Sequence, residues 1–345
     1  MRGTPDTTRP TRALLVLTLV ALAGCEEPPV DVVAPAAPAE AEVAGEGFVR
    51  RDVRFACAET ACAAWLYLPA RPGPAPVVVM AHGFGGTRDV ALPFFAERFA
   101  REGLAALVFD YRHFGASGGT PRQLVDPWRQ LDDWRAALAW ARAQPELDGA
   151  RVALWGTSLG AGHALLVAAE DGALRAVVGQ APQVDSSAEG EATFYGVGWV
   201  LRLLGSAWLD LAAGWLGRPP VEIPAIARAG EFGMLVDDAA YAAFESQVPA
   251  ESRYRNAVAA RGILLFDSWN PAESQGRLRA PLLLIASRAD RFAPFTAVER
   301  YVAATPGASL AEIEGDHFDV YAAPVRERAA ELAAGFLARE LAPER

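Results

Sequence analysis

The sequence contains no lysine, so all 32 of its basic residues are arginines, and it has only four histidines and three cysteines. The absence of lysine excludes Schiff-base chemistry and a serine–lysine catalytic pair. The few histidines and cysteines lack the spacing of metal ligands, so we expect no metal. The net charge of −10 lacks the basic excess of nucleic-acid-binding proteins. Because 52% of the 345 residues are apolar, the chain can bury a large core and is not disordered as a whole.

The first 24 residues have the composition of an export signal. Three arginines precede an apolar run over residues 13–23, which is too short to cross a bilayer as a helix. The run ends in the tetrad LAGC, which resembles the box at which bacterial lipoproteins are cleaved and then lipidated on the cysteine. We therefore expect a lipoprotein signal peptide over 1–24 and lipidation at Cys25. The protein would then be anchored to a bacterial membrane in the cell envelope. An ordinary signal peptide that contains a cysteine is the alternative.

A different composition follows over residues 25–49. This stretch is rich in proline and alanine and holds six acidic residues but no basic one. Such a sequence buries little apolar surface, so we expect a disordered linker. The folded domain is predicted to span residues 50–345. The remaining acidity is spread over this domain and indicates no particular partner.

Two cysteines lie in neighbouring segments with strand-like alternation. Cys57 ends one segment, Cys62 begins the next, and a turn near Glu59 joins them. A β-hairpin of this kind brings the two thiols within bridging distance. In an exported protein the pair is expected to form a disulfide.

From residue 75 onward, short apolar runs alternate with helical patterns. The expected strands are 77–81, 104–110, 151–155, 174–179, 281–287 and 309–313. The expected helices are 89–102, 127–143, 158–170, 294–304 and 324–341. This alternation predicts an α/β fold with a mostly parallel, doubly wound sheet preceded by the hairpin.

The interval of about 185–275 breaks this alternation. It contains long helical patterns and no clear strand, which favours a helical cap inserted over the sheet. Its most apolar part, 196–217, is not expected to span a membrane, because Arg202 and Asp210 lie inside it.

The pattern G-x-S-x-G occurs twice, around Ser117 and around Ser158. Ser158 lies between an expected strand and an expected helix, which is the setting of a nucleophile elbow. The flanking glycines allow the sharp turn that exposes the hydroxyl oxygen. Ser117 is followed by Gly-Gly-Thr-Pro, which does not start a helix, so we interpret it as a turn residue.

A serine nucleophile needs a base within hydrogen-bonding reach. His317 follows the last expected strand, where a loop returns toward the elbow, and we predict it as the base. The other three histidines are interpreted as structural: His82, His113 and His163.

The acid that orients the base is expected between the serine and the histidine, after a strand. Asp290 follows the strand at 281–287 and is our prediction, and Asp267 is the alternative. Two further aspartates flank His317 but lie too close to it along the chain.

An acyl-transfer intermediate also needs hydrogen-bond donors for its oxyanion. We predict the backbone N–H of Leu159, at the start of the elbow helix, and that of Phe84. Phe84 lies in the glycine-rich loop HGFGG (82–86) after the first strand of the regular pattern.

Together these stretches resemble the α/β-hydrolase superfamily. FDYRHFGASGG (109–119), GTSLG (156–160), DRFAP (290–294) and HFDVY (317–321) are similar to its dienelactone-hydrolase-like and serine-aminopeptidase-like branch. The resemblance covers about residues 50–345. It implies the fold and a helical cap after the strand at 174–179, but it does not specify the substrate.

The predicted function is that of a serine hydrolase that cleaves a carboxylic ester or related acyl bond without a cofactor. Aromatic side chains in the cap either bind a hydrophobic part of a small-molecule substrate or form the core of the cap: Phe194, Tyr195, Trp199, Trp208 and Phe232. One alternative is a serine aminopeptidase that holds the substrate amine with Glu191 or Glu231. The other is a binding lipoprotein without catalytic activity. No nucleic-acid partner is expected.

Overall fold

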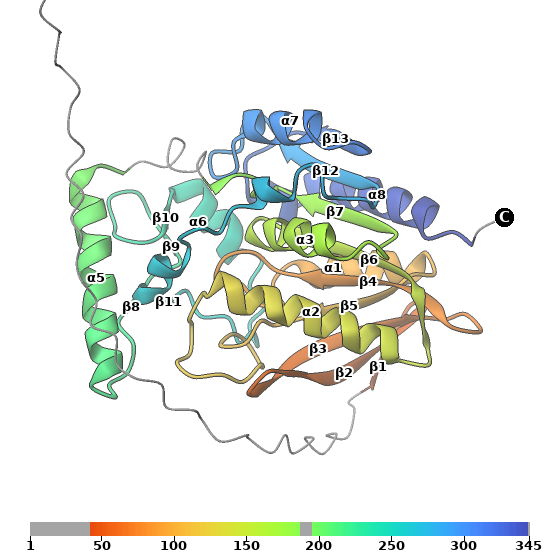
Figure 1. The fold of residues 1–345 in the computed structure, drawn as a ribbon, viewed down its shortest axis with the longest axis horizontal. Helices are drawn as coiled ribbons and strands as arrows, with labels where there is room; N and C mark the ends of the chain where they lie inside the picture. Colours follow the sequence, from red (N-terminus) through yellow and green to blue (C-terminus); the bar gives the residue numbers. More distant parts are fainter. Residues whose placement is uncertain (1–41, 187–194, 344–345) are drawn as a thin grey trace, which may run out of the picture. The chain divides into compact units, whose positions relative to one another are not determined.

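The computed structural model describes residues 42–186 and 195–343. Within these residues the chain forms a nine-stranded sheet in the order β1-β2-β3-β5-β4-β6-β7-β12-β13 (Figure 1). The strands of this sheet are β1 Glu42–Gly45, β2 Phe48–Cys57, β3 Thr60–Pro69, β4 Ala75–Ala81, β5 Ala105–Phe109, β6 Leu147–Thr157, β7 Ala176–Gln180, β12 Leu282–Ser287 and β13 Ala308–Ile313.

The sheet is parallel from β5 to β13, and the predicted α/β class is confirmed. β1, β2 and β3 are antiparallel to one another, and β3 is antiparallel to β5. One boundary differs from the prediction, because β1 lies within the range assigned to the linker. Glu42 pairs with Arg51 across the turn to β2, so backbone pairing orders residues whose side chains are exposed.

Helices cover both faces of the sheet. α1 (Leu92–Arg101) and α8 (Val325–Glu340) contribute to one apolar cluster. The cluster on the other face contains residues of α2 (Pro127–Ala143), α3 (Leu159–Glu170) and α7 (Phe295–Ala303). Alternate residues of β4 enter the two clusters, and every residue of this strand is buried. Burial on both faces explains why the central strands are continuous apolar runs.

The predicted hairpin is formed by β2 and β3, and a disulfide joins Cys57 to Cys62. Both cysteines are fully buried beside the core. Their sulfur atoms lie close to the carboxylate of Asp133, but disulfide-bonded sulfurs offer no thiolate to a metal ion.

Most of the described part of the insertion lies in residues 195–275, which form the cap. Its helices are α5 Val197–Trp215, α6 Asp238–Glu245 and the 3₁₀ helices η1 Ala260–Leu265 and η2 Pro271–Ser274. The cap also contains four short strands that the sequence pattern does not predict: β8 Glu222–Ile223, β9 Ile226–Ala227, β10 Leu235–Val236 and β11 Val258–Ala259. A strand of two residues is too short to produce an alternating pattern.

The cap lies at one end of the central sheet, with α5 at its outer edge (Figure 1). No helix in the described ranges is long and apolar enough to cross a membrane. A further 3₁₀ helix, η3 (Asp319–Tyr321), follows β13 and leads toward α8.

Candidate active site

Ser158 occupies the junction between β6 and α3. Its backbone has φ 54° and ψ −122°, a conformation that a residue with a side chain rarely adopts. The flanking glycines make this turn possible. A Cβ atom at Gly156 would lie 2.2 Å from the carbonyl oxygen of Gly160, and one at Gly160 would lie 2.5 Å from that of His82. The local structure is therefore that of a nucleophile elbow.

The structure brings His317 and Asp290 to this serine. His317 Nε2 lies 3.0 Å from Ser158 Oγ, and His317 Nδ1 lies 2.7 Å from Asp290 Oδ2. The second oxygen of Asp290 accepts hydrogen bonds from the backbone N–H groups of Phe292 and Ala293, at 2.9 and 2.8 Å. Asp290 is thus held in one orientation by its own turn at the end of β12.

Aromatic rings enclose the imidazole of His317. The ring of Phe318 packs edge-on at a centroid distance of 4.9 Å, and that of Phe292 does so at 5.6 Å. His317 and Asp290 are both buried, so little water competes for the hydrogen bond between them. Low local polarity strengthens such an interaction.

The glycine-rich loop after β4 lies directly against the elbow. A Cβ atom at Gly83 would lie 3.0 Å from Ser158 Cβ, so the loop approaches this closely because Gly83 has no side chain. Among the described residues, no protein acceptor receives a hydrogen bond from the backbone N–H of Phe84 or of Leu159. Two backbone donors next to the serine are therefore left available for a ligand.

A cavity of about 460 Å³ opens beside Ser158 and His317. Its wall is mostly apolar and is shared between the sheet loops and the cap. The described residues that line it are Phe84, Ser158, Gln183, Ser186, Tyr195, Trp199, Val200, Met234, Leu235, Ile263, Phe266, Phe292, Ala293 and His317.

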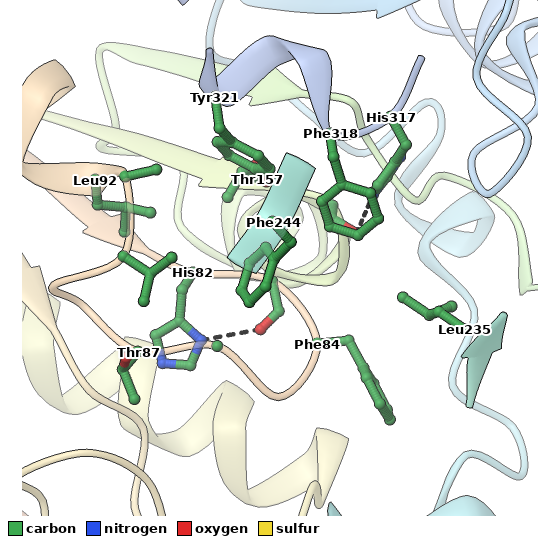
Figure 2. Close-up of a pocket in the computed structure, with 15 residues that line it drawn as sticks. His82, Phe84, Thr87, Leu92, Thr157, Leu235, Phe244, His317, Phe318 and Tyr321 are labelled. Carbon is green, nitrogen blue, oxygen red and sulfur yellow. Dashed lines mark hydrogen bonds between the residues drawn. The ribbon is translucent and has the colours of Figure 1, made fainter. Parts of the chain in front are cut away.

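A much smaller space of about 30 Å³ lies on another side of the same two residues. Figure 2 shows its wall, to which Phe244 of the cap contributes together with Phe318 and His82. A space of this size accommodates about one water molecule.

The cap aromatics predicted to bind substrate separate into three groups. Tyr195 and Trp199 line the large cavity. The prediction is wrong for Trp208, which is 61% exposed, because it points away from the sheet on the opposite side of α5. Phe232 lies behind Trp199, at a ring distance of 6.4 Å, and supports the wall without forming it. Phe194 lies outside the described residues.

Several lining residues were missed from the sequence. Met234, Leu235, Ile263 and Phe266 come from cap segments whose side-chain directions depend on tertiary packing. Phe292 could have been predicted as a residue of the site, because it lies two positions after Asp290 within the DRFAP segment.

Of the other three histidines, His82 and His163 have their hydrogen bonds elsewhere, although His82 lines the small space together with Ser158 and His317. Burial lowers the pKa of His82, whose Nδ1 lies 2.9 Å from the carbonyl oxygen of Gly83. Burial also lowers the pKa of His113 to about 4 and that of His163 to about 3. His163 is held between Gln130 and Trp269 in the core.

The alternative serine, aspartate and glutamate residues considered above are not part of the hydrogen-bonded group around Ser158. Ser117 is buried in a turn, where its hydroxyl group donates to the Asp110 carbonyl oxygen and accepts from the backbone N–H of Ala63. Asp267 is exposed on the cap. Glu231 is exposed and does not line the cavity, while Glu191 lies outside the described residues.

Comparison with known proteins is consistent with this architecture. Residues 60–319 match the family model described as X-Pro dipeptidyl-peptidase (S15 family). The chain is 39% identical over 288 residues to the quorum-quenching protein AidA of Acinetobacter baumannii (strain MDR-ZJ06), covering 84% of this chain and 94% of that protein. It is 27% identical to a thiohydrolase of Eupenicillium brefeldianum, covering 79% and 88% of the two chains.

A solved structure supports the same assignment. The α/β hydrolase GrgF from Penicillium sp. sh18 superposes with a TM-score of 0.72 at 25% identity, covering 85% of this chain and 99% of that chain. The family match, the relatives and the shared architecture agree with one another. The chain is therefore an α/β-hydrolase enzyme that belongs to the X-Pro dipeptidyl-peptidase (S15) family.

Proposed function

We propose that the protein hydrolyses a carboxylic ester or a related acyl bond through a covalent acyl-enzyme. The observation that carries this proposal is the chain of hydrogen bonds from Asp290 through His317 to Ser158, beside an apolar cavity. An alcohol is a weak nucleophile until a neighbouring base removes its proton. The geometry supports His317 in that role.

In the proposed reaction, Ser158 Oγ attacks the acyl carbon while His317 Nε2 takes the hydroxyl proton. Asp290 accepts the hydrogen bond from Nδ1–H and stabilises the resulting imidazolium. The tetrahedral intermediate collapses when its bond to the leaving group breaks and His317 returns the proton to that group. The backbone N–H groups of Phe84 and Leu159, which have no acceptor among the described residues, stabilise the oxyanion.

Hydrolysis of the acyl-enzyme requires a water molecule beside His317. The space of about 30 Å³ adjoins both Ser158 and His317, and Thr157 also lines it. We assign the hydrolytic water to this space. His317 removes a proton from the water as its oxygen attacks, and Ser158 then leaves with that proton.

The large cavity favours a substrate with an apolar part. Its wall contains aromatic and aliphatic side chains from both the cap and the sheet loops. Apolar groups enter such a site because their contact with water is lost. The names of the relatives include a quorum-quenching protein and a thiohydrolase, which is compatible with an ester or thioester of a small molecule.

A peptidase activity is the second candidate, because the matching family model is described as a dipeptidyl-peptidase. Such an enzyme needs a negative group that binds the free amine of its substrate. Among the described residues that line the cavity there is no aspartate or glutamate. This observation favours the acyl-ester proposal.

The central test is covalent labelling of the purified full chain with a fluorophosphonate, which reacts with activated serines. Ser158→Ala is expected to abolish labelling and to reduce ester hydrolysis by a factor on the order of 10⁴ or more. Ser117→Ala, in the other G-x-S-x-G segment, is the matched control and should remain labelled. Labelling that persists in Ser158→Ala would refute the assignment.

Substrate classes are separated by comparing p-nitrophenyl esters of increasing acyl length with aminoacyl anilides. The proposal predicts turnover of the esters, with higher kcat/KM for apolar acyl groups. Turnover of the anilides alone would establish the peptidase instead.

We also propose that the protein is exported and anchored to a membrane through lipid on Cys25. The support is the LAGC sequence after an apolar run of signal-peptide length. Cys25→Ser is expected to release the protein from the membrane fraction of a bacterial host. Incorporation of labelled fatty acid into the unmodified chain, but not into the variant, is the independent measurement.

A further inference from the structure

The outer face of α5 is apolar and exposed. We define this face by its large apolar side chains, which repeat at helical spacing along one side of the helix: Val197, Leu201, Leu204, Trp208, Leu209, Trp215 and Leu216. Trp208 is 61% exposed, Leu216 is 73% exposed and Trp215 is 82% exposed. Contiguous apolar surface of this kind marks an interaction site on a folded protein.

α5 is apolar on both sides and carries one buried charge on its inner side. Its inner side carries Asp210, which is fully buried and paired with Arg261 of η1 at 2.8 Å. Asp210 also accepts hydrogen bonds from the backbone N–H groups of Val221 and Arg261. A helix on a protein surface normally turns its charges outward and its apolar residues inward. On α5 large apolar side chains are exposed on the outer side while an aspartate is buried on the inner side, which favours an apolar environment at the outer face.

Two exposed arginines lie in α5 or directly after it. Between residues 195 and 220 the charged residues are Arg202, Asp210 and Arg218. Both arginines are exposed, whereas the aspartate is buried. The Arg202 guanidinium group lies over the ring of Phe232, 4.1 Å from its centroid. Over residues 195–220, exposed apolar side chains are therefore accompanied by two exposed arginines, while the aspartate is buried.

From this combination we propose that the outer face of α5 binds the surface of a bilayer that contains anionic lipids. Tryptophan side chains are favoured at the boundary between headgroups and acyl chains. Arginines beside them attract anionic headgroups. α5 does not meet the requirements for a spanning helix, so it lies in the plane of the interface.

The chain outside the described region is compatible with this placement. Cys25, the proposed lipid attachment site, precedes Glu42 by 17 residues. An extended segment of that length reaches roughly 55–60 Å, which allows the domain to rest on the membrane that holds the lipid. An anchor and a weak apolar face together give firmer attachment than either one alone.

If the proposed function is correct, the location of α5 also affects how substrates reach the cavity. Trp199 and Val200 of the same helix line the large cavity, while Leu201 faces outward. α5 therefore separates the cavity from the proposed bilayer by the thickness of one helix. Substrates with an apolar part concentrate in the bilayer and would reach the cavity along its edge.

Vesicle binding of the full chain tests the proposal, with Cys25→Ser in every sample so that lipid on the chain plays no part. The test variant is Trp208→Gln with Trp215→Gln. The matched control is Trp128→Gln, which alters a tryptophan that is 47% exposed on α2. Sedimentation with vesicles of phosphatidylglycerol and phosphatidylcholine gives the partition coefficient. Because the sequence before residue 42 is the same in all samples, differences report on α5.

We expect the double variant to lower the partition coefficient by on the order of tenfold or more, because two large apolar side chains no longer enter the bilayer. The control should bind as the unmodified chain does. Arg218→Gln should weaken binding about fivefold to anionic vesicles and leave binding to phosphatidylcholine alone unchanged. Thermal unfolding midpoints that agree among the variants exclude misfolding as the cause.

Two outcomes would overturn the proposal. One is equal vesicle binding by the double variant and the control. The other is a dimer of the parent protein, measured by analytical ultracentrifugation without lipid, that the double variant abolishes. That result would assign the face to a second copy of the chain. Both measurements are independent of catalysis, so they remain informative if the proposed hydrolase activity fails its own test.

Discussion

The guanidinium group of Arg291 binds the carboxylate of Asp316 through Nε and Nη2, at 3.0 and 2.9 Å. Arg291 follows the candidate acid Asp290, and Asp316 precedes the candidate base His317. The same guanidinium also lies 2.7 Å from Asp237, the N-cap of α6 in the cap. One arginine therefore connects the two loops of the site to the cap.

Replacing this arginine is expected to lower activity without abolishing it. Arg291 is 54% exposed, and ion pairs at exposed sites are weak, so we predict that Arg291→Gln lowers kcat/KM by about threefold to tenfold. Arg291→Lys should recover part of the loss, because lysine keeps the charge but not the two hydrogen bonds that converge on Asp316 Oδ2. Ester hydrolysis measured across a salt series checks this, since salt should affect the parent more than the glutamine variant.

The control for this measurement is Arg328→Gln. Arg328 forms an exposed pair with Glu331 on α8 and should not affect catalysis. Equal activity of Arg291→Gln and the parent, at low and at high salt, would contradict the proposed positioning role.

The elbow predicts a sharp difference between two glycines. In Gly156→Ala the new Cβ would lie 2.2 Å from a backbone oxygen, which does not move away easily. We expect destabilisation by about 2–4 kcal/mol and loss of most activity. Gly205→Ala is the matched control, because Gly205 lies within α5 and a Cβ there would meet no atom within 4 Å. That substitution should stabilise the protein by about 0.5–1 kcal/mol. Chemical denaturation of both variants compares the two free energies of unfolding.

If the large cavity binds the acyl group, a larger side chain in its wall should exclude longer acyl chains. Val200→Trp adds bulk to the wall of the cavity of about 460 Å³. We expect kcat/KM for long-chain acyl esters to fall by about tenfold or more, and kcat/KM for acetyl esters to change by less than about threefold. Ala139→Trp, on the exposed side of α2, is the control and should keep the parent's chain-length profile. A uniform loss across all acyl lengths would argue against this cavity as the acyl site.

Acid should weaken the fold through the buried histidines. Burial lowers the pKa of His163 from its ordinary value of 6.5 to about 3, so the folded protein keeps this ring neutral while the unfolded chain protonates it. The unfolded state therefore binds more protons between pH 6.5 and 3, and stability falls as pH decreases through this window. Between pH 7 and 5 the contribution of His163 to the loss is about 2 kcal/mol.

Urea unfolding at pH 7, 6 and 5 measures this dependence. His163→Gln keeps a polar side chain near Gln130 and Trp269 but removes the titration, so its stability should vary less with pH. His82 and His113 are also held neutral by burial and act in the same direction. An unchanged pH slope in the variant would show that His163 is not responsible.

The sequence alone predicted the parallel strands of the sheet, its main helices and Ser158, Asp290 and His317 as candidate site residues. The reason is local: apolar runs and helical periodicity predict strands and helices, and glycines around Ser158 indicate a turn that only they permit. The hairpin cysteines were predictable for the same reason, since a short turn alone brings them together.

The tertiary structure decided what local patterns do not encode. β1 becomes ordered by pairing with β2, although its own side chains are exposed and its composition is that of a linker. Trp199 and Trp208 belong to the same helix, yet one lines the cavity and the other faces outward. α5 is apolar on both sides, so its sequence pattern does not predict which side packs against the rest of the domain. The inner side is the one on which Asp210 forms a buried ion pair with Arg261, a residue distant in sequence.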